Sequence, residues 1–177
     1  MGIAGVVLLV FGLVGGTSAA SCDVCFTTYD QTVSSSSPSD EQKCIAAKEY
    51  IRCLVQAEGS GCDKRSSRLK TAIIEVQRVD GISGKTCLLT DTCQCQVNFY
   101  RSNVVGHLNH CYASVVQNLC AITAKDTSCD DITTNEVFTV STAETWVNAC
   151  RNTGSVTVQS VMTVAVMTIL AALQRLQ

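Results

Sequence analysis

The chain has 177 residues, with 12 cysteines, a single proline and a formal net charge of −2 at pH 7. Its charges are interspersed and no basic run occurs, so nucleic acid is not an expected partner. Cysteine makes up about 9% of the segment between the apolar chain ends, a level typical of disulfide scaffolds and of an oxidising rather than a reducing compartment.

Residues 1–20 have the pattern of a secretory signal peptide. An apolar core runs from Val6 to Val14, Gly15 and Gly16 follow it, and the small residues Ser18 and Ala20 fit a signal peptidase site. The apolar stretch is too short to span a bilayer comfortably and has no basic flank. We therefore expect cleavage after Ala20 and export of the remaining chain.

The cysteines form two sets with the same order of spacings. In each set a close pair comes first, a C-x8-C-x8-C core follows, and the last cysteine lies further along the chain. We expect a mainly α fold of two tandem, small, disulfide-stapled helical modules, residues 21–90 and 91–152, with three disulfides each and the pairing within each set left open. The sets are Cys22, Cys25, Cys44, Cys53, Cys62 and Cys87, then Cys93, Cys95, Cys111, Cys120, Cys129 and Cys150.

Two helices are expected in the first module. The segment Ser39–Gln42 is a capping box, and the helix that it begins should continue to Glu58 and end before Gly59. A second helix is expected over Ser66–Val79, with Gly81 ending it.

Each module should have a central helix with cysteines on its edges. In the first, Cys44 and Cys53 lie about 180° apart and border one apolar stripe. In the second, a helix over Val104–Ala124 carries Cys111 and Cys120 in the same way. Nine residues of helix span about 13.5 Å, which is too far for a disulfide, so neither pair should bond internally.

The apolar residues of the second central helix fall on the other side of its cysteine line. Duplication of the first module does not predict this difference. Either the second module turns its helix differently, or the two helices face a shared core, or the repeated spacing is a coincidence. These residues are Leu108, Tyr112, Val115, Val116, Leu119 and Ile122.

The second module should end with a further helix. Ser141–Glu144 is a capping pattern, and the helix after it carries Trp146, Val147 and Cys150. The preceding segment Val137–Val140 has β-like composition but is short, so a strand and a helical turn both remain open.

The C-terminal residues have the pattern of a glycosylphosphatidylinositol (GPI) attachment signal. Asn152-Thr153-Gly154 is a run of small residues, a polar spacer follows, and an apolar run extends over Val161–Leu173. We expect Asn152 to accept the glycolipid and residues 153–177 to be a removed propeptide. The alternative is a transmembrane helix over residues 156–173, about 27 Å long and barely the thickness of the hydrocarbon layer.

The sequence does not predict catalysis, a bound metal or a cofactor. Cys22-x2-Cys25 has the spacing of a redox motif, but no βαβ pattern surrounds it. His107-x2-His110 could join cysteines around zinc, but thiols in an exported protein oxidise first. Neither histidine has an obvious nucleophile partner, and no Gly-x-Ser-x-Gly motif occurs.

We therefore expect a disulfide-rich recognition, adhesion or receptor-like protein on the extracellular face of the plasma membrane. Its expected partners are an extracellular protein or ligand that the sequence does not identify, and the membrane through a lipid anchor. The alternative is a secreted helical carrier of a small apolar ligand, which should contain an apolar pocket of several hundred Å³.

Overall fold

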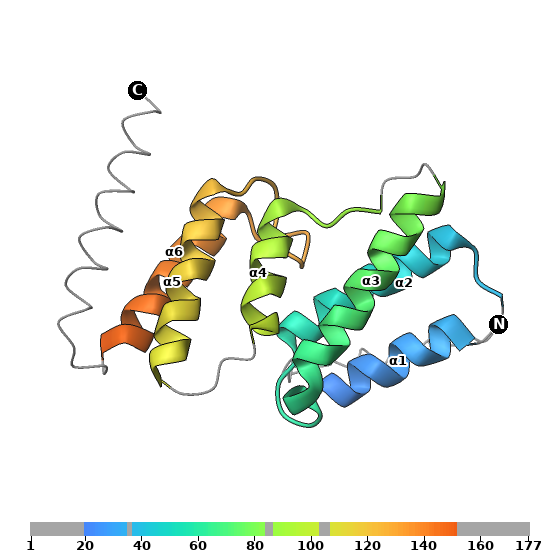
Figure 1. The fold of residues 1–177 in the computed structure, drawn as a ribbon, viewed down its shortest axis with the longest axis horizontal. Coiled ribbons are helices and arrows are strands. Elements are labelled where there is room, and N and C mark those ends of the chain that lie inside the picture. Colours follow the sequence, from blue (N-terminus) through green and yellow to red (C-terminus); the bar gives the residue numbers. More distant parts are fainter. Residues whose placement is uncertain (1–19, 35–36, 84–86, 103–106, 152–177) are drawn as a thin grey trace, which may run out of the picture.

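The computed structural model describes residues 20–34, 37–83, 87–102 and 107–151. Within these ranges all regular structure is helical, which confirms the mainly α, disulfide-rich fold (Figure 1). The elements are α1 (Cys22–Ser34), α2 (Asp40–Gln56), the 3-10 turn η1 (Cys62–Lys64), α3 (Arg65–Ser83), α4 (Asp91–Arg101), α5 (His107–Thr123) and α6 (Asn135–Arg151).

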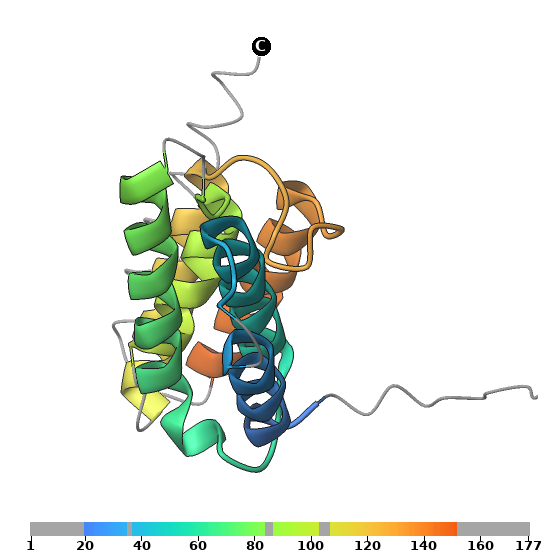
Figure 2. The ribbon, with the colours of Figure 1, turned by 90° about the vertical axis from the view of Figure 1, so that its right-hand side faces the viewer.

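The helices form two groups that meet at α4. Helices α1, α2 and α3 pack together at one end of the molecule, and α5 pairs with α6 at the other (Figure 1). In the view of Figure 2, α1–α3 lie nearer the reader and the α5–α6 pair lies behind them. Helix α4 packs against α5 and also against α2 and α3, so it joins the two groups.

The predicted capping box at the start of α2 is confirmed. The Ser39 hydroxyl accepts from the Gln42 backbone N–H, and the Gln42 side chain accepts from the Ser39 N–H. The helix ends at Gln56, two residues before the predicted Glu58, because Ala57 already has an extended backbone. Gly59 follows with a φ of 83°, a left-handed conformation that glycine adopts without strain.

The predicted end of the next helix was wrong. Helix α3 runs from Arg65 to Ser83 and passes through Gly81. A lone glycine inside a helix costs only about 1 kcal/mol. Just beyond the helix, the backbone N–H of Cys87 donates to the Asp80 carboxylate at 2.8 Å. This bond and the Cys44–Cys87 disulfide tie the end of α3 to its neighbours.

The predicted start of the last helix was also wrong. Helix α6 begins at Asn135, so Val137–Val140 is helical and Ser141 lies inside the helix. Tertiary packing explains the difference, because Phe138 is buried against Cys95 and overrides the β preference of its neighbours.

Helices α1 and α4 were not predicted, whereas α5 agrees with its expected segment. The described part of α5 runs from His107 to Thr123, and residues 104–106 of the predicted segment lie outside the described residues. Helix α1 is rich in threonine and lacks a clear apolar period. The disulfides of Cys22 and Cys25 hold it against the neighbouring segments.

The largest core lies among α1, α2, α3 and one side of α4. It includes Ile51, Leu54 and Leu69 with Val97 from α4. The opposite side of α4 faces a much smaller cluster, in which Cys95 meets Ala121 and Phe138. The two groups of helices thus have cores of very different size.

Candidate functional site

The six disulfides repeat one connectivity. In each set the first cysteine bonds to the fifth, the second to the fourth and the third to the sixth, and every cysteine is paired. The bonds of the first set are Cys22–Cys62, Cys25–Cys53 and Cys44–Cys87, and those of the second are Cys93–Cys129, Cys95–Cys120 and Cys111–Cys150. As expected from helix geometry, neither central helix contains an internal bond.

The shared connectivity allows α2 and α5 to be compared position by position. The core cysteines Cys44, Cys53 and Cys62 correspond to Cys111, Cys120 and Cys129, each pair separated by 67 positions. Val55 of α2 is buried, whereas its equivalent Ile122 in α5 is half-buried. The other buried positions of α2 are Ala46, Ala47, Tyr50, Ile51 and Leu54. The equivalent residues of α5 are buried as well, and they are Ala113, Ser114, Gln117, Asn118 and Ala121.

This correspondence shows whether α5 is turned differently from α2. Helix α5 is not turned differently from α2, because it buries the same positions relative to its cysteines. The two helices differ in the chemistry of those positions, which are apolar in α2 and mostly polar or small in α5. Of the apolar residues that the sequence marked as a core stripe of α5, Tyr112 and Val116 are exposed, whereas Val115, Leu119 and Ile122 are half-buried.

At the outward positions the chemistry is reversed, because α2 has mostly charged residues there and α5 has apolar ones. In α2 they are Ile45, Lys48, Glu49 and Arg52, of which three are charged. In α5 the equivalents are Tyr112, Val115, Val116 and Leu119, which we call the α5 outer face. Tyr112 is 72% exposed and Val116 46% exposed, whereas Val115 packs partly against Trp146 of α6. Exposed apolar side chains on a helix that disulfides hold in place form a candidate interaction surface.

Hydrogen bonds satisfy the polar inner side of α5. Asn118 Nδ2 donates to the Thr139 carbonyl at 3.0 Å and to Thr142 Oγ1 at 2.9 Å, which joins α5 to α6. The buried Ser114 hydroxyl donates to the His110 carbonyl. Since Ser114 and Asn118 have hydrogen-bond partners, their burial leaves no unsatisfied polar group at these two residues.

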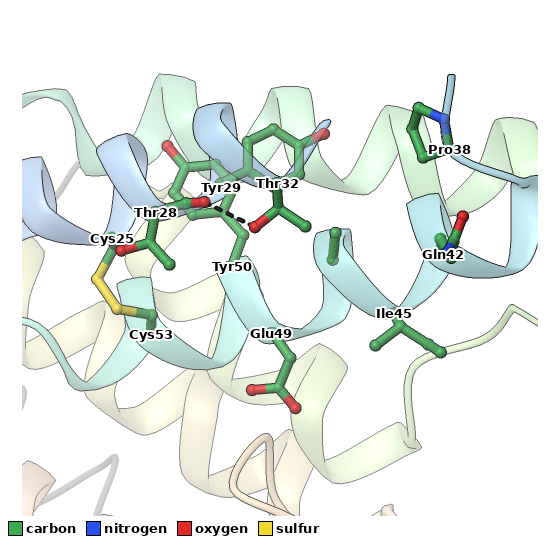
Figure 3. A pocket seen from close by; sticks show the side chains of 11 residues that line it. Cys25, Thr28, Tyr29, Thr32, Pro38, Gln42, Ile45, Glu49, Tyr50 and Cys53 are labelled. Carbon is green, nitrogen blue, oxygen red and sulfur yellow. Dashed lines mark hydrogen bonds between the residues drawn. A yellow bond between two sulfur atoms is a disulfide. The ribbon is translucent and has the colours of Figure 1, made fainter. Parts of the chain in front are cut away.

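A groove of about 690 Å³ lies between α1 and α2 (Figure 3). The Cys25–Cys53 disulfide lies at one end of the labelled residues and Pro38 at the other. Tyr29 and Tyr50 line the groove with stacked rings, whose centroids are 4.5 Å apart. Burial raises the pKa of both phenols, and Tyr50 Oη has no hydrogen-bond partner among the described residues.

The charged groups of the first helix group mainly hold the fold together. Arg68 Nη2 donates to Asp23 at 2.8 Å and Arg68 Nη1 donates to the Cys22 carbonyl. Hydrogen bonds from Ser60 and Arg68 lower the pKa of the Asp23 carboxyl. This cluster ties the start of α1 to the loop before η1 and to α3.

A second carboxylate organises the loop between α5 and α6. Asp130 accepts from the Ser128 hydroxyl and from the backbone N–H groups of Ile132 and Thr133. Partial burial acts to raise the pKa of Asp130, but the bonds from Thr133, Ile132 and Ser128 outweigh it and hold the pKa far below its usual value. The carboxylate is thus a structural acceptor that fixes the turn before α6.

The other residues singled out from the sequence are bonded in disulfides, are exposed, or lie outside the described residues. Cys22 and Cys25 bond to different partners, so they do not form a redox pair. His110 is exposed on α5 with its ring against the edge of Phe99. No group of three or more metal-binding side chains occurs within the described ranges. The proposed attachment residue Asn152, the signal segment 1–20 apart from Ala20, and residues 153–177 lie outside the described residues.

Sequence reasoning missed both surfaces described here. The α5 outer face was visible as an apolar stripe, but a stripe alone does not tell whether it faces a core or the solvent. The groove depends on α1, whose helix was not predicted, although Tyr29 in α1 and Tyr50 in α2 were the available aromatic signals.

Comparison with known proteins identifies no relative. No family model matches, and neither the curated proteins nor the solved structures contain a significant match. None of the helices within the described ranges is both long enough and apolar enough to cross a membrane. The six disulfides indicate an oxidising, extracellular or secretory environment.

Proposed function

We propose that this protein is a disulfide-rich recognition or adhesion protein, without catalysis, tethered to the outer face of the plasma membrane. The observation that carries the proposal is the α5 outer face, an apolar surface held outward on a covalently fixed helix. Tyr112 and Val116 are exposed there, and the equivalent positions of α2 hold Ile45, which is also exposed, and the charged Glu49. A large side chain such as Tyr112 is a typical anchor of protein interfaces.

The ends of the chain support the tether. Residues 1–20 fit a signal peptide, and Asn152 directly follows Arg151, the last residue of α6. All twelve cysteines lie before this point, so the disulfide scaffold is complete without residues 153–177. A lipid at Asn152 would attach the scaffold to the membrane through the end of α6.

Phospholipase C treatment of cells that express the full chain tests the tether. We expect the enzyme to release the protein from the cell surface. Replacing Asn152, Thr153 and Gly154 together by bulky residues should abolish release and retain the protein in the secretory pathway. A chain that ends at Gly154 should be secreted with all its thiols oxidised. Retention of the full chain after treatment would contradict the lipid anchor and favour the transmembrane alternative over residues 156–173.

The groove between α1 and α2 favours a second candidate function, a secreted carrier of a small apolar ligand. Its volume of about 690 Å³ lies within the range of about 300–1,000 Å³ that is usual for small-molecule sites. The stacked rings of Tyr29 and Tyr50 would offer an aromatic surface to a flat ligand.

A matched pair of tryptophan variants tests the carrier. Thr32→Trp would place a large ring in the groove, whereas Thr27→Trp changes an exposed threonine of α1 that does not line it. Both hydroxyls bond a carbonyl one turn earlier, so the backbone effects should be similar. The carrier function predicts that only Thr32→Trp weakens binding of a fluorescent apolar probe. Equal binding by both variants and the unchanged protein would exclude the groove as the site.

A further inference from the structure

We propose that the groove between α1 and α2 binds a neutral apolar molecule that accepts a hydrogen bond from the Tyr50 hydroxyl. The inference rests on the carrier function, the second candidate above, and names the class of its ligand. That class is a flat, uncharged molecule with one accepting oxygen atom, such as a ketone. It does not depend on the tether, because α1, α2 and the segment between them line the groove.

The Tyr50 hydroxyl is a buried polar group without a partner. Tyr50 is 4% exposed and lines the groove, and its Oη has no hydrogen-bond partner among the described residues. Burying a hydroxyl without a partner is unfavourable, and such groups are rare in folded proteins. An oxygen atom of a ligand in the groove would supply the missing acceptor.

The charges around the groove favour a neutral ligand. Among the described residues that line it, Glu49 is the only charged one, and Arg52 pairs with it at 3.8 Å. A carboxylate, such as that of a fatty acid, would therefore be buried beside Tyr50 without a cation lining the groove to pair with it. Burial raises the pKa of Tyr50, so the phenol keeps its proton at neutral pH and can donate a hydrogen bond.

The aromatic residues of the groove favour a flat ligand. The rings of Tyr29 and Tyr50 lie within 10° of parallel, with their centroids 4.5 Å apart, between α1 and α2 (Figure 3). Aromatic side chains bury a large apolar surface and stack on other flat rings. A flat apolar molecule therefore matches this part of the groove better than a branched one.

The disulfides of α1 leave room for a ligand to reach the hydroxyl. The ring of Tyr29 lies against that of Tyr50 and is the more exposed of the two. Cys22 and Cys25 fix the first four residues of α1, whereas its later turns, which carry Tyr29 and Thr32, contain no cysteine. A small shift of these later turns would open space beside Tyr50, while the Cys25 disulfide keeps the other end of the groove closed (Figure 3).

Two probes of the same shape test the inference. 2-Acetylnaphthalene carries a carbonyl oxygen, and 2-isopropenylnaphthalene has a methylene group in its place. Binding of each radiolabelled probe is measured on membranes of cells that express the full chain, and the part lost in Thr32→Trp is binding in the groove. We expect Tyr50→Phe to lower the affinity for the ketone about fivefold relative to the hydrocarbon, because a net hydrogen bond of about 1 kcal/mol is lost.

Two further measurements separate the contact with the ligand from an effect on folding. Tyr29→Phe removes the other hydroxyl of the stacked pair and should leave the ratio of the two affinities unchanged. On heating, Tyr50→Phe should become sensitive to protease at the same temperature as the unchanged chain or at a higher one, since its hydroxyl has no hydrogen bond to lose. A lower temperature would show that the hydroxyl is already paired in the free protein and would overturn the inference.

The carrier function and the ligand class fail in different ways. If neither probe loses binding in Thr32→Trp, the groove is not a ligand site and both fail. If both probes bind in the groove but Tyr50→Phe leaves the ratio of affinities unchanged, the carrier function stands and the contact with Tyr50 is wrong. The same conclusion follows if Tyr29→Phe lowers the ratio as much as Tyr50→Phe does.

Discussion

The two central helices show that one covalent frame can hold two opposite distributions of side chains. In α2 most apolar residues face inward, and the charged residues and Ile45 face out, whereas α5 buries Ser114, Gln117 and Asn118 and exposes Tyr112 and Val116. Both helices are held by the same three-bond connectivity. A small module whose disulfides restrict the unfolded chain depends less on an apolar core, and its apolar residues are then available for binding.

The largest difference between the modules should follow removal of equivalent disulfides. Cys95→Ala with Cys120→Ala should cost the second module about 2–5 kcal/mol and unfold it, because the buried apolar cluster at that bond, in the part of the chain that the structure describes, adds just Ala121 and Phe138 to Cys95. Cys25→Ala with Cys53→Ala removes the same bond from the first module, where the larger core should keep the helices folded. Limited proteolysis with mass spectrometry locates the unfolded segment. Equal protection of both modules in the two variants would contradict the account.

The apolar core of the first module is tested by giving α2 the residue that α5 has at the equivalent position. Leu54→Ala copies Ala121 and should lower the free energy of unfolding by about 3 kcal/mol, because it removes a fully buried side chain. Leu88→Ala makes the same change at an exposed site and should cost less than about 1 kcal/mol. Urea unfolding measures both. Equal losses would show that the first core contributes no more than surface contacts.

The loop of the second module should depend on pH through Asp130. Asp130→Ala should lower the free energy of unfolding by about 2 kcal/mol at pH 7, since it removes hydrogen bonds to a charged acceptor. The folded-state pKa of Asp130 lies below its unfolded value. Its stabilisation is therefore complete above about pH 4, the pKa of an unfolded aspartate, and is lost as the pH falls toward the folded value.

Stability measured between pH 7 and pH 2 tests whether the stabilisation by Asp130 is lost on acidification. The difference between the unchanged protein and Asp130→Ala should shrink as the pH decreases. Asp30→Ala, at an exposed position in α1, serves as the control and should change stability little at any pH. A difference that grows on acidification would contradict the assigned role of Asp130.

The smallest expected effects concern the helix caps, one at the start of α2 and one at the start of α4. Ser39→Ala should cost about 1 kcal/mol, because it removes the acceptor for the Gln42 N–H. Thr90→Ala at the start of α4 should cost more, since Thr90 accepts from the Cys93 N–H and also donates to the Thr127 carbonyl. Thermal unfolding of the two variants compares them. A larger loss for Ser39→Ala would show that the contact with Thr127 contributes nothing.

Much of the fold could be predicted from local sequence signals. Cysteine spacing indicated three disulfides per set, and the Ser39 capping box indicated the start of α2, because both signals depend on neighbouring residues alone. Local signals failed at Phe138 and at Gly81. Packing makes the segment around Phe138 helical, and the contacts at the end of α3 let α3 continue past Gly81. Local propensity contains neither effect.

The candidate site was harder to predict than the fold. The sequence showed that Tyr112 and Val116 lie on the side of α5 opposite to the apolar side of α2, but periodicity does not distinguish a buried stripe from an exposed one. That distinction depends on which side the disulfides turn toward the neighbouring helices. Cys111–Cys150 and Cys95–Cys120 both hold α5 in its orientation, and these pairings were among several that the spacing allowed.

Peptide mapping under non-reducing conditions is the most direct test of the shared frame. Digestion and mass spectrometry of the secreted chain should recover Cys25 linked to Cys53 and, equivalently, Cys95 linked to Cys120. The remaining bonds should join the first cysteine to the fifth and the third to the sixth within each set, and no free thiol should be found. A bond between the two sets, or a different order in one of them, would contradict the equivalence of α2 and α5 on which the account depends.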